Sequence, residues 1–376
     1  MQIEIGKNIQ QKEGFSAFIP HPFPPKGLEA TIRSLGVKAA KAERYVGKLD
    51  GITHTLPNVD FFLKMFELKD ATSSAQIEGT KATMIDALEK KAGVATKDTD
   101  ADDILYYIKA LHYGMQRIKT FPISLRLIKE LHSKLMDGAR ASHYADPGNF
   151  RKTQNWIGGT LPSNASYVPP PAHEIKRTLG DLEKFIYEEK TYLPLIHSAL
   201  IHAQFESIHP FLDGNGRMGR LLITMLWTQR EILEKPVLFL SSYFKKHQKI
   251  YYQKLQNYHE GDITAWVEFF LDGIIETAKD SIEICRKITT LWKKDMAKMQ
   301  ALAKREATSG VSVLEKLYGE PIISSKTIMK WTGFTRAGAQ KLIDRFIKLS
   351  ILEVKNEVES YDRTYIYKDY LNIFIS

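Results

Sequence analysis

The chain lacks the features that mark secreted and membrane-embedded proteins. One cysteine, Cys285, occurs among 376 residues, which excludes an intramolecular disulfide and a zinc site built from cysteines. No apolar run reaches the ~20 residues that a membrane-spanning helix needs. The first residues, Met1 to Glu4, include no basic segment followed by an apolar one, so no signal peptide is expected. These absences predict a cytoplasmic protein in a reducing compartment.

What the chain does contain is enough apolar sequence for several cores. Hydrophobic residues make up 43% of the sequence, which argues against disorder, and the length allows two or three domains. The net charge is +9 and the pI is about 9.2. Such a charge fits a solvated basic surface, or an anionic partner such as a nucleotide or a nucleic acid. Charge alone does not choose between them.

Periodicity divides the chain into four expected regions. An N-terminal region covers 1–120, a catalytic region 121–280, a linker helix 281–310 and a small C-terminal domain 311–376. The prolines at 20–25 predict an extended arm. Helical patterns cover 56–118, with a charged loop at 97–103, and then 122–137 and 173–280, and a polar helix follows that Gly310 is expected to break. Dense turn signals at 146–171 predict a small β-hairpin.

The C-terminal region has the element order of a winged helix. Short helices are expected from Val313 and over Ser324–Trp331, Thr335 caps a third helix, and strands are expected at 351–356 and 363–368. The third helix carries Arg336, Lys341, Arg345 and Lys348, so it could enter a DNA major groove. It could equally be a solvated face used for protein contacts or dimerisation. Acidic residues weigh against DNA binding, namely Asp344, Glu353, Glu357 and Glu359.

One loop between two apolar helices contains the residues suited to chemistry. It reads His209-Pro-Phe-Leu-Asp-Gly-Asn-Gly-Arg-Met-Gly-Arg220. Gly214 and Gly216 let the backbone adopt positive φ and approach a ligand. Successive N–H groups, together with the N-terminus of the next helix, form an anion-binding concavity. Arg217 and Arg220 lie three residues apart and suit phosphate oxygens.

Other side chains in this loop complete a set for nucleotidyl transfer. Asp213 offers a hard oxygen to Mg²⁺, and Asn215 can donate to a phosphate oxygen. His209 can exchange a proton near neutral pH. In such a reaction, positioning and charge stabilisation do most of the work.

The loop resembles the signature of the Fic family, HPFx[D/E]GNGRxxR, and matches it at every specified position. The segments Pro147–Arg151, Ile157–Gly159 and Tyr167–Pro170 resemble that family's flap, and Trp266 lies in a stretch similar to its later helices. The resemblance covers roughly residues 55–275. It implies a mainly α fold, a Fic helical domain with a β-hairpin flap over the site, to which the chain adds its C-terminal winged helix.

The resemblance also implies an activity. His209 would deprotonate a Tyr, Ser or Thr hydroxyl of a target protein, the chain itself being one candidate, and that oxygen would attack the α-phosphorus of ATP. Asp213 would hold Mg²⁺, Phe211 would anchor the loop, and the flap would hold the target as an added strand. The family's kinase-like branch, Doc, has lysine where Gly216 stands, so AMP transfer is favoured over phosphate transfer. The expected nucleotide-binding residues are Asp213, Gly214, Asn215, Gly216, Arg217, Met218, Gly219 and Arg220, with Tyr252 and Tyr251 at the adenine.

A second motif resembles the family's inhibitory segment, [S/T]xxxE[G/N]. It runs from Ser74 through Glu78 to Gly79, and by itself it also fits a capped helix end, with Ser74 near the start and Gly79 just past the end. As an inhibitor, Glu78 would pair with Arg217 or Arg220 and occupy the place of the γ-phosphate.

Two alternatives remain open at the level of sequence. The chain could be a DNA-binding regulator in which the Fic region senses a nucleotide, or a Fic enzyme that uses another donor such as UTP. A homodimer is suggested by the resemblance alone.

Overall fold

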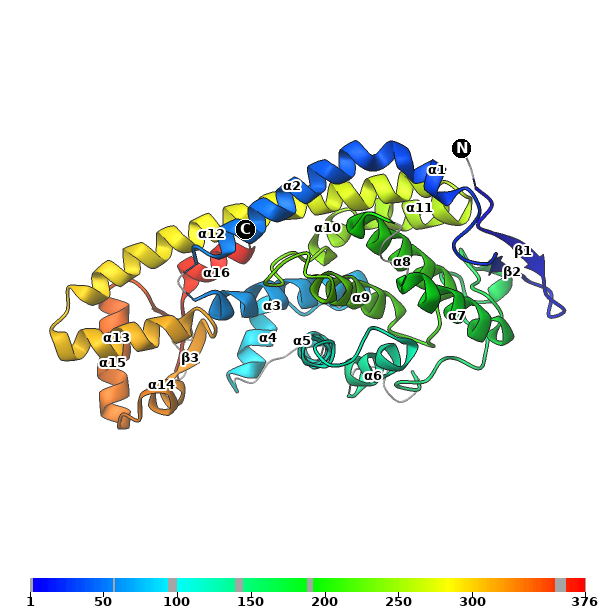
Figure 1. Cartoon of the computed structure of the whole chain (residues 1–376). Coiled ribbons are helices and arrows are strands. Elements are labelled where there is room, and N and C mark those ends of the chain that lie inside the picture. Colours follow the sequence, from blue (N-terminus) through cyan, green and yellow to red (C-terminus); the bar gives the residue numbers. More distant parts are fainter. Residues whose placement is uncertain are drawn as a thin grey trace.

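The computed structural model describes residues 3–56, 58–93, 100–138, 145–187, 192–355 and 363–375. It is mainly helical, with two small sheets. Two long helices, α2 (Gly36–Thr53) and α12 (Ile263–Gln300), run side by side along one edge of the molecule. The remaining helices lie beneath them, with an N-terminal hairpin at one end and the C-terminal elements at the other (Figure 1).

The N-terminal residues form ordered elements where the prolines predicted an extended arm. Strands β1 (Gly6–Gln10) and β2 (Ser16–Pro20) pair antiparallel, and the short α1 (Leu28–Ile32) and a 3-10 turn (Arg33–Leu35) lead into α2. The prolines themselves lie at the end of β2 and in the irregular segment 21–27, whereas the hairpin before them and α2 after them were not predicted. Ala39, Ala42, Val46 and Leu49 recur at helical spacing and are buried, and α2 packs along α12.

The next helical stretch is interrupted earlier than expected. Helix α3 (Val59–Ile77) ends before Gly79, α4 (Met84–Lys91) follows, and α5 (Ala101–Arg117) begins inside the predicted charged loop. The loop's residues 97–99 lie outside the described residues. Ser74 lies in the last turn of α3, not near a helix start, whereas Gly79 has φ +89° and stands just past the helix end as expected.

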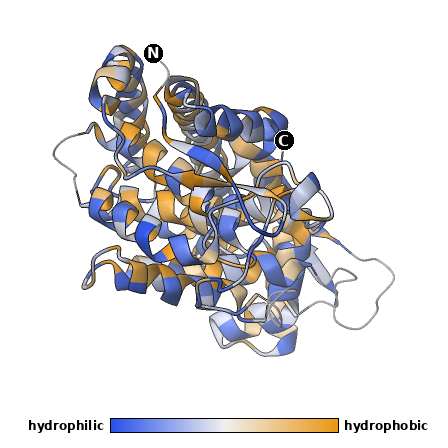
Figure 2. Ribbon diagram, turned by 90° about the vertical axis from the view of Figure 1, so that its right-hand side faces the viewer, coloured by the Kyte–Doolittle hydropathy of each residue, from blue (hydrophilic) through white to orange (hydrophobic). Residues whose placement is uncertain are grey.

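Six further helices form the centre of the molecule. They are α6 (Leu125–Met136), α7 (Ile175–Ile186), α8 (Pro194–Ile208), α9 (Asn215–Gln229), α10 (Ser241–Lys246) and α11 (Gln248–His259). Nearly every residue of α8 is buried, so this helix forms the middle of the core. Figure 2 shows apolar residues gathered where the helices meet. Within the described residues, no helix is both long and apolar enough to span a lipid bilayer.

The predicted hairpin at 146–171 is reduced to a single bridge. Ile157 and Tyr167 exchange both backbone hydrogen bonds, at 2.9 and 3.1 Å, and the only regular elements described there are 3-10 turns at Pro162–Asn164 and Ala172–Glu174. The Asn164 side chain accepts from the backbone N–H groups of Thr160 and Leu161. These backbone N–H groups bond within the turn and are not available to a longer strand ladder. We call residues 155–168 the flap.

The long polar helix ends before Gly310, where the sequence predicts its end. Helix α12 runs unbroken to Gln300, about 57 Å at 1.5 Å per residue, and α13 (Lys304–Leu317) turns back after a break at 301–303. Gly310 lies inside α13, where an added Cβ would press on Met299 Sδ. Close helix packing therefore explains this glycine.

The C-terminal helices lie near their expected positions. They are α14 (Ser325–Thr332) and α15 (Arg336–Lys348), with Thr335 capping α15 as predicted. A three-stranded sheet, in the order β3–β5–β4, joins Ile322–Ser324, Thr364–Ile366 and Glu353–Val354. Strand β3 and the final helix α16 (Lys368–Ile375) were not expected. Glu357 and Glu359 lie outside the described residues, and the winged-helix assignment stays a prediction.

Aromatic side chains fix this C-terminal unit to α3 and α12. The Tyr318 ring lies 5.0 Å from that of Phe62 on α3 and 5.2 Å from that of Trp292 on α12. Phe374 of α16 packs edge-on against Phe66, also on α3, at 5.4 Å. Buried aromatic contacts of this kind hold packed elements in one arrangement. The helix that carries Ser74 and Glu78 therefore has the C-terminal unit against its outer face.

Candidate active site

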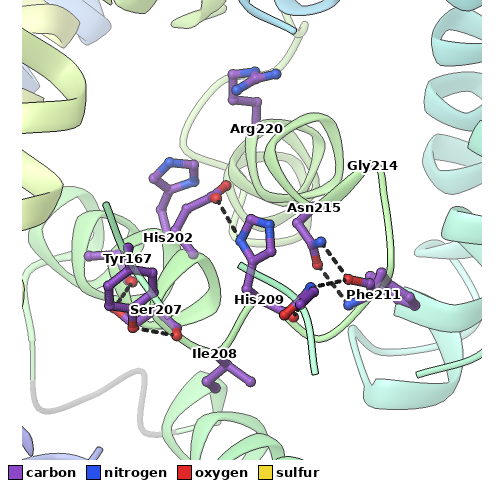
Figure 3. A network of polar contacts seen from close by, with 12 residues as sticks. Tyr167, His202, Ser207, Ile208, His209, Phe211, Gly214, Asn215 and Arg220 are labelled. Carbon is purple, nitrogen blue, oxygen red and sulfur yellow. Dashed lines mark hydrogen bonds and ion pairs between the residues drawn. The ribbon is translucent and has the colours of Figure 1, made fainter. Parts of the chain in front are cut away.

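The loop from His209 to Gly214 is a tight connection between two buried helices. His209 ends α8 in the left-handed region, with φ +49°, and Gly214 precedes α9 with φ +77°. Gly214 therefore uses the freedom of glycine to adopt positive φ, whereas Gly216 has ordinary helical backbone angles that any residue can adopt. The requirement at Gly216 is space, because a Cβ there would overlap Glu78 Oε1. Figure 3 shows His209 and Asn215 at the start of α9.

Asn215 closes the loop on itself. Its Oδ1 accepts from the Phe211 N–H and its Nδ2 donates to the Phe211 carbonyl, both at 2.8 Å (Figure 3). The side chain is 2% exposed. Both of these bonds run to backbone, so Asn215 sets the loop's shape and leaves the N–H groups of the α9 N-terminus for an anion. Its Nδ2 has a second N–H, and a bond from this amide to a phosphate stays a prediction.

Phe211 is the buried anchor that the sequence predicted. Its ring stacks on the imidazole of His132 from α6, with centroids 3.6 Å apart and planes 2° apart. His132 accepts from Gly148 N–H at Nδ1, so its Nε2–H donates to the Asp213 carbonyl. Burial lowers the pKa of His132 to about 4, which keeps this tautomer neutral. His132 was missed because it lies 81 residues from Asp213 in sequence.

His209 is held by its backbone from one side. Arg151 Nε donates to the His209 carbonyl at 2.9 Å, and another nitrogen of that guanidinium donates to the Pro170 carbonyl at 2.6 Å. Arg151 is 3% exposed, so it fixes the base of the flap to the loop. Burial lowers the pKa of His209 to about 4, with the Arg151 charge acting in the same direction. The imidazole is therefore neutral at pH 7 and able to accept a proton.

Glu206 is a site residue that sequence reasoning missed. It lies one turn before His209 on α8, and its Oε2 is 3.9 Å from His209 Nδ1. Its Oε1 has no hydrogen-bond partner among the described residues, and burial raises the pKa of this carboxyl to about 8. The signal was present as the i, i+3 spacing of Glu206 and His209 within a predicted helix.

Glu78 and Arg220 form an ion pair beside this loop. Arg220 Nη2 donates to Glu78 Oε1 at 2.6 Å. The same guanidinium donates to Ser74 twice, from Nε to Oγ at 2.9 Å and from Nη2 to the carbonyl at 3.0 Å. Burial opposes the ionisation of Glu78, but the charge and hydrogen bond of Arg220, together with the charges of Arg217 and His209, lower the pKa of the carboxyl overall. Ser74 and Glu78 therefore both bond to Arg220, and Gly79 forms the turn that positions Glu78.

Arg217 is directed elsewhere. Its guanidinium lies 3.8 Å from Asp103 Oδ1 and 3.5 Å from Asp213 Oδ2, and it also contacts Met136 Sδ. Of the two arginines that the sequence offered to Glu78, the structure pairs only Arg220 with it. Residues three apart lie only about 60° apart around a helix, so the two side chains are separated by their partners: Arg217 meets Asp103 and Asp213, and Arg220 meets Glu78 and Ser74.

A cavity of about 630 Å³ lies over the loop. This size is typical of a small-molecule site. It is lined by His209, residues 212–216, Arg220, Glu78 and Glu206, by flap residues, and by Tyr251, Tyr252, Leu255, Gln256 and His259. Tyr252 is 47% exposed at the rim, whereas Tyr251 is 1% exposed and its hydroxyl bonds to His202. Tyr251 is therefore mainly a core residue.

Three predicted nucleotide contacts do not line this cavity, namely Arg217, Met218 and Gly219. Met218 has its side chain in the core. Gly219 faces away, and a Cβ there would overlap Glu206 Oε1. Met218 and Gly219 lie on sides of α9 that pack against neighbouring elements, because a helix that has one side toward a cavity packs its other sides against its neighbours. Their roles are close packing of α9 on α8.

The donor set fits Mg²⁺ held together with a nucleotide. Within the described part of the chain, no group of three or more metal-ligating side chains occurs. Mg²⁺ commonly binds one or two carboxylates and takes its other ligands from phosphates and water. The Asp213 side chain is 43% exposed and lines the cavity, so one carboxylate is available.

Sequence comparisons agree with this geometry. Residues 37–116 match the Fic/DOC family N-terminal region and residues 122–227 match the Fic/DOC family. The chain therefore belongs to the Fic/DOC family. It is 30% identical over 210 residues to the protein adenylyltransferase Fic of Culex quinquefasciatus, and 30% identical over 209 residues to that of Drosophila melanogaster. The first match covers 53% of this chain and 38% of the relative's length, so the chain spans well under half of these relatives.

Solved structures show the same fold. A Fic family protein from Desulfovibrio desulfuricans G20 has a TM-score of 0.56 at 18% identity, covering 88% of this chain and 95% of that one. Fic-1 of C. elegans, residues 134–508, has a TM-score of 0.50 at 17% identity, covering 70% and 79%. At these identities the likeness concerns the fold alone.

Proposed function

We propose that the protein is an adenylyltransferase, which transfers AMP from ATP to a Tyr, Ser or Thr hydroxyl of a target protein. One observation carries the proposal. A neutral imidazole, the N-terminus of α9 and a buried guanidinium line one cavity. A proton acceptor beside a helix N-terminus and a guanidinium supports the proposal, because attack on a phosphoryl centre requires a base beside groups that bind anions.

The reaction follows from these positions. The triphosphate lies over the N-terminus of α9, and His209 takes the proton of the target hydroxyl. That oxygen forms a bond to the α-phosphorus while the bond from the α-phosphorus to the β-phosphate oxygen breaks, and pyrophosphate leaves. Asp213 would hold Mg²⁺, which when bound neutralises charge on the phosphates. The flap, tied to His209 through Arg151, holds the target chain.

The same geometry supports autoinhibition. Glu78 Oε1 occupies the space directly over Gly216 and is bonded to Arg220. A terminal phosphate that reached Arg220 would meet a carboxylate there, and two anions at one site repel each other. We propose that this pair excludes or misplaces the γ-phosphate, so that removal of Glu78 raises transfer.

Labelled ATP tests the proposal. With Mg²⁺, Glu78→Gly should incorporate α-phosphate label into protein and no γ-phosphate label, at least about tenfold faster than wild type. His209→Ala in the Glu78→Gly background should lose about 10²–10⁴-fold, as expected for a missing general base. Intact mass should show an AMP adduct where the protein modifies itself. Transfer of γ label alone would overturn adenylylation, and an unchanged rate in Glu78→Gly would overturn autoinhibition while leaving the enzyme in place.

Two alternatives stay predictions. The sequence motifs do not specify the base of the nucleotide, so UTP or another donor is tested by the same assay with other labelled nucleotides. For the regulator alternative, α15 exposes Lys341 and Lys348, but Arg345 donates to Glu306 at 2.6 Å and Asp344 is exposed among them. Salt-dependent retention on DNA without labelling of protein would favour that regulator.

A further inference from the structure

A second cavity lies on the opposite side of α3 from the loop. It measures about 540 Å³ and is bounded by the second half of α3, by Thr83, Met84 and Ile85, by α10, and by the end of α16. It shares no residue with the cavity over the loop. We call it the α3–α10 cavity. Its volume suits a small molecule.

The charged side chains that line the α3–α10 cavity are all cationic. Lys69, Lys245 and Lys246 line it, and no carboxylate does among the described residues. Lys246 is already paired, since its Nζ lies 2.6 Å from Glu276 Oε1. Within the described part of the chain, Lys245 bonds only to an amide oxygen, that of Gln76. Lys69 is half-buried, and burial lowers its pKa although Asp280 acts in the opposite direction. Lys69, which is partly buried, and Lys245, which is exposed, thus have no bonded carboxylate among the described residues, and both can meet an anion in the cavity.

Hydroxyl groups supply further donors. Thr72 is 5% exposed, and its hydroxyl has no hydrogen-bond partner among the described residues. Ser73 and Ser242 bond to each other at 3.1 Å across the cavity wall. A buried hydroxyl without a partner is costly. A ligand with several acceptor oxygens would satisfy the hydroxyls and the lysines together.

The remaining wall is apolar. Met84, Ile85, Phe374 and Ile375 provide it. A ligand that filled the cavity would therefore combine an anionic group with an apolar or aromatic part. Inorganic phosphate alone would leave this wall uncovered, which disfavours it as the full occupant.

We propose that the α3–α10 cavity binds a small organic phosphate, whose phosphate meets Lys69 and Lys245 and whose apolar part meets Met84 and Phe374. The site also touches the inhibitory segment. Lys245 donates to Gln76 Oε1, and Gln76 Nε2 donates to the Ala82 carbonyl at 2.8 Å. Gln76 precedes Glu78 by two residues, so a phosphate that captures Lys245 removes a contact holding the end of α3 and weakens the Glu78–Arg220 pair. This second step rests on the proposed function.

Methionine NMR with phenyl phosphate tests the binding. With ¹³C-methyl methionine in the full-length chain, the Met84 signal should shift saturably, and more tightly than with inorganic phosphate. Lys69→Gln and Lys245→Gln should each weaken binding by about tenfold, the usual effect of one lost charged contact. Lys249→Gln, an exposed lysine of α11 outside the cavity, should bind as wild type does.

Other outcomes would overturn it. Met136 contacts Arg217 at the loop, so a shift of Met136 without Met84 would place the probe at the loop. Equal affinity in wild type and Lys69→Gln, or no shift at all, would also remove the proposal. For the coupling, phenyl phosphate should raise α-label transfer by wild type and leave Glu78→Gly unchanged. If no variant transfers label, the proposed function fails, while the Met84 titration still decides the cavity.

Discussion

At the scale of single residues, burial sets the protonation of the groups around His209. Water would solvate an ionised Glu206 or a protonated His209, and the core does not. The pKa of Glu206 rises to about 8 and that of His209 falls to about 4. Both side chains are therefore mostly neutral at pH 7. The imidazole is left as the acceptor, with an uncharged carboxylic acid beside its Nδ1.

The stability of the protein should record the protonation of Glu206. In the unfolded chain this carboxyl ionises near its ordinary pKa of 4.5, but in the folded protein only near 8. Its contribution to folding is fully present below pH 4.5 and is lost as the pH rises toward 8. Glu206→Gln mimics the protonated acid, so its free energy of unfolding should gain on wild type by up to a few kcal/mol between pH 5 and 8, since one pKa unit is about 1.4 kcal/mol.

Urea unfolding at several pH values measures this difference. The exposed Glu268→Gln is the control, and its difference from wild type should stay constant over that range. Parallel curves for Glu206→Gln and wild type would show that Glu206 is ionised in the folded protein.

At the scale of elements, the end of α3 positions the inhibitory carboxylate. Thr80 N–H donates to the Ala75 carbonyl at 3.2 Å and Gly79 N–H to the Gln76 carbonyl at 3.1 Å. These two bonds, with Gly79 at φ +89°, form a Schellman motif. Glu78 is its C-cap residue, so the turn that stops the helix also points Glu78 at α9.

Gly79→Ala should weaken that turn. No atom lies within 4 Å of the added Cβ, so the cost is conformational, about 1–2 kcal/mol for an L-residue in the left-handed region. The free energy of unfolding should fall by that amount and α-label transfer should rise, though less than in Glu78→Gly. Gly333→Ala is matched, being a helix C-cap at φ +72° with equally open space. It should lose similar stability without faster transfer. Equal transfer rates in wild type and Gly79→Ala would show that the turn at Gly79 does not contribute to inhibition.

At the scale of the whole molecule, the C-terminal unit and the inhibitory helix share one buried aromatic cluster. Tyr370 lies 4.6 Å from Tyr318 and 6.4 Å from Phe62, centroid to centroid. The Tyr318 hydroxyl bonds to that of Tyr367 at 3.0 Å. Among the described residues the Tyr370 hydroxyl, also buried, has no partner. Within one cluster, the Tyr318 hydroxyl is therefore hydrogen-bonded, whereas the Tyr370 hydroxyl has no partner among the described residues.

Substitution by phenylalanine should separate these two tyrosines. Tyr370→Phe removes an unsatisfied hydroxyl and should keep or raise stability by up to about 1 kcal/mol, whereas Tyr318→Phe breaks a buried bond and should cost about 1–3 kcal/mol. Thermal and urea unfolding measure both, and each variant is the other's control because ring packing is unchanged. A loss in Tyr370→Phe as large as that in Tyr318→Phe would reveal a partner for its hydroxyl, such as a buried water.

The sequence alone predicted the elements whose signals are local. The positions of α6, α14 and α15 follow from apolar periodicity and caps, and the loop from His209 to Arg220 is contiguous. Predictions failed where a local signal competed with packing. Glycine predicts a helix break at 310, but Gly310 allows α13 to approach Met299. The turn residues at 146–171 leave room for only one bridge.

The chemical groups of the site can be read from the sequence, because twelve neighbouring residues supply the imidazole, the carboxylate, the glycines and the arginines. Which of these groups act on one another depends on how the helices pack. Arg220 and Glu78 are 142 residues apart, and the packing of α3 on α9 brings them together while turning Arg217 toward Asp103. The shift in the Glu206 pKa depends equally on neighbours from several helices, since desolvation is a property of the assembled core.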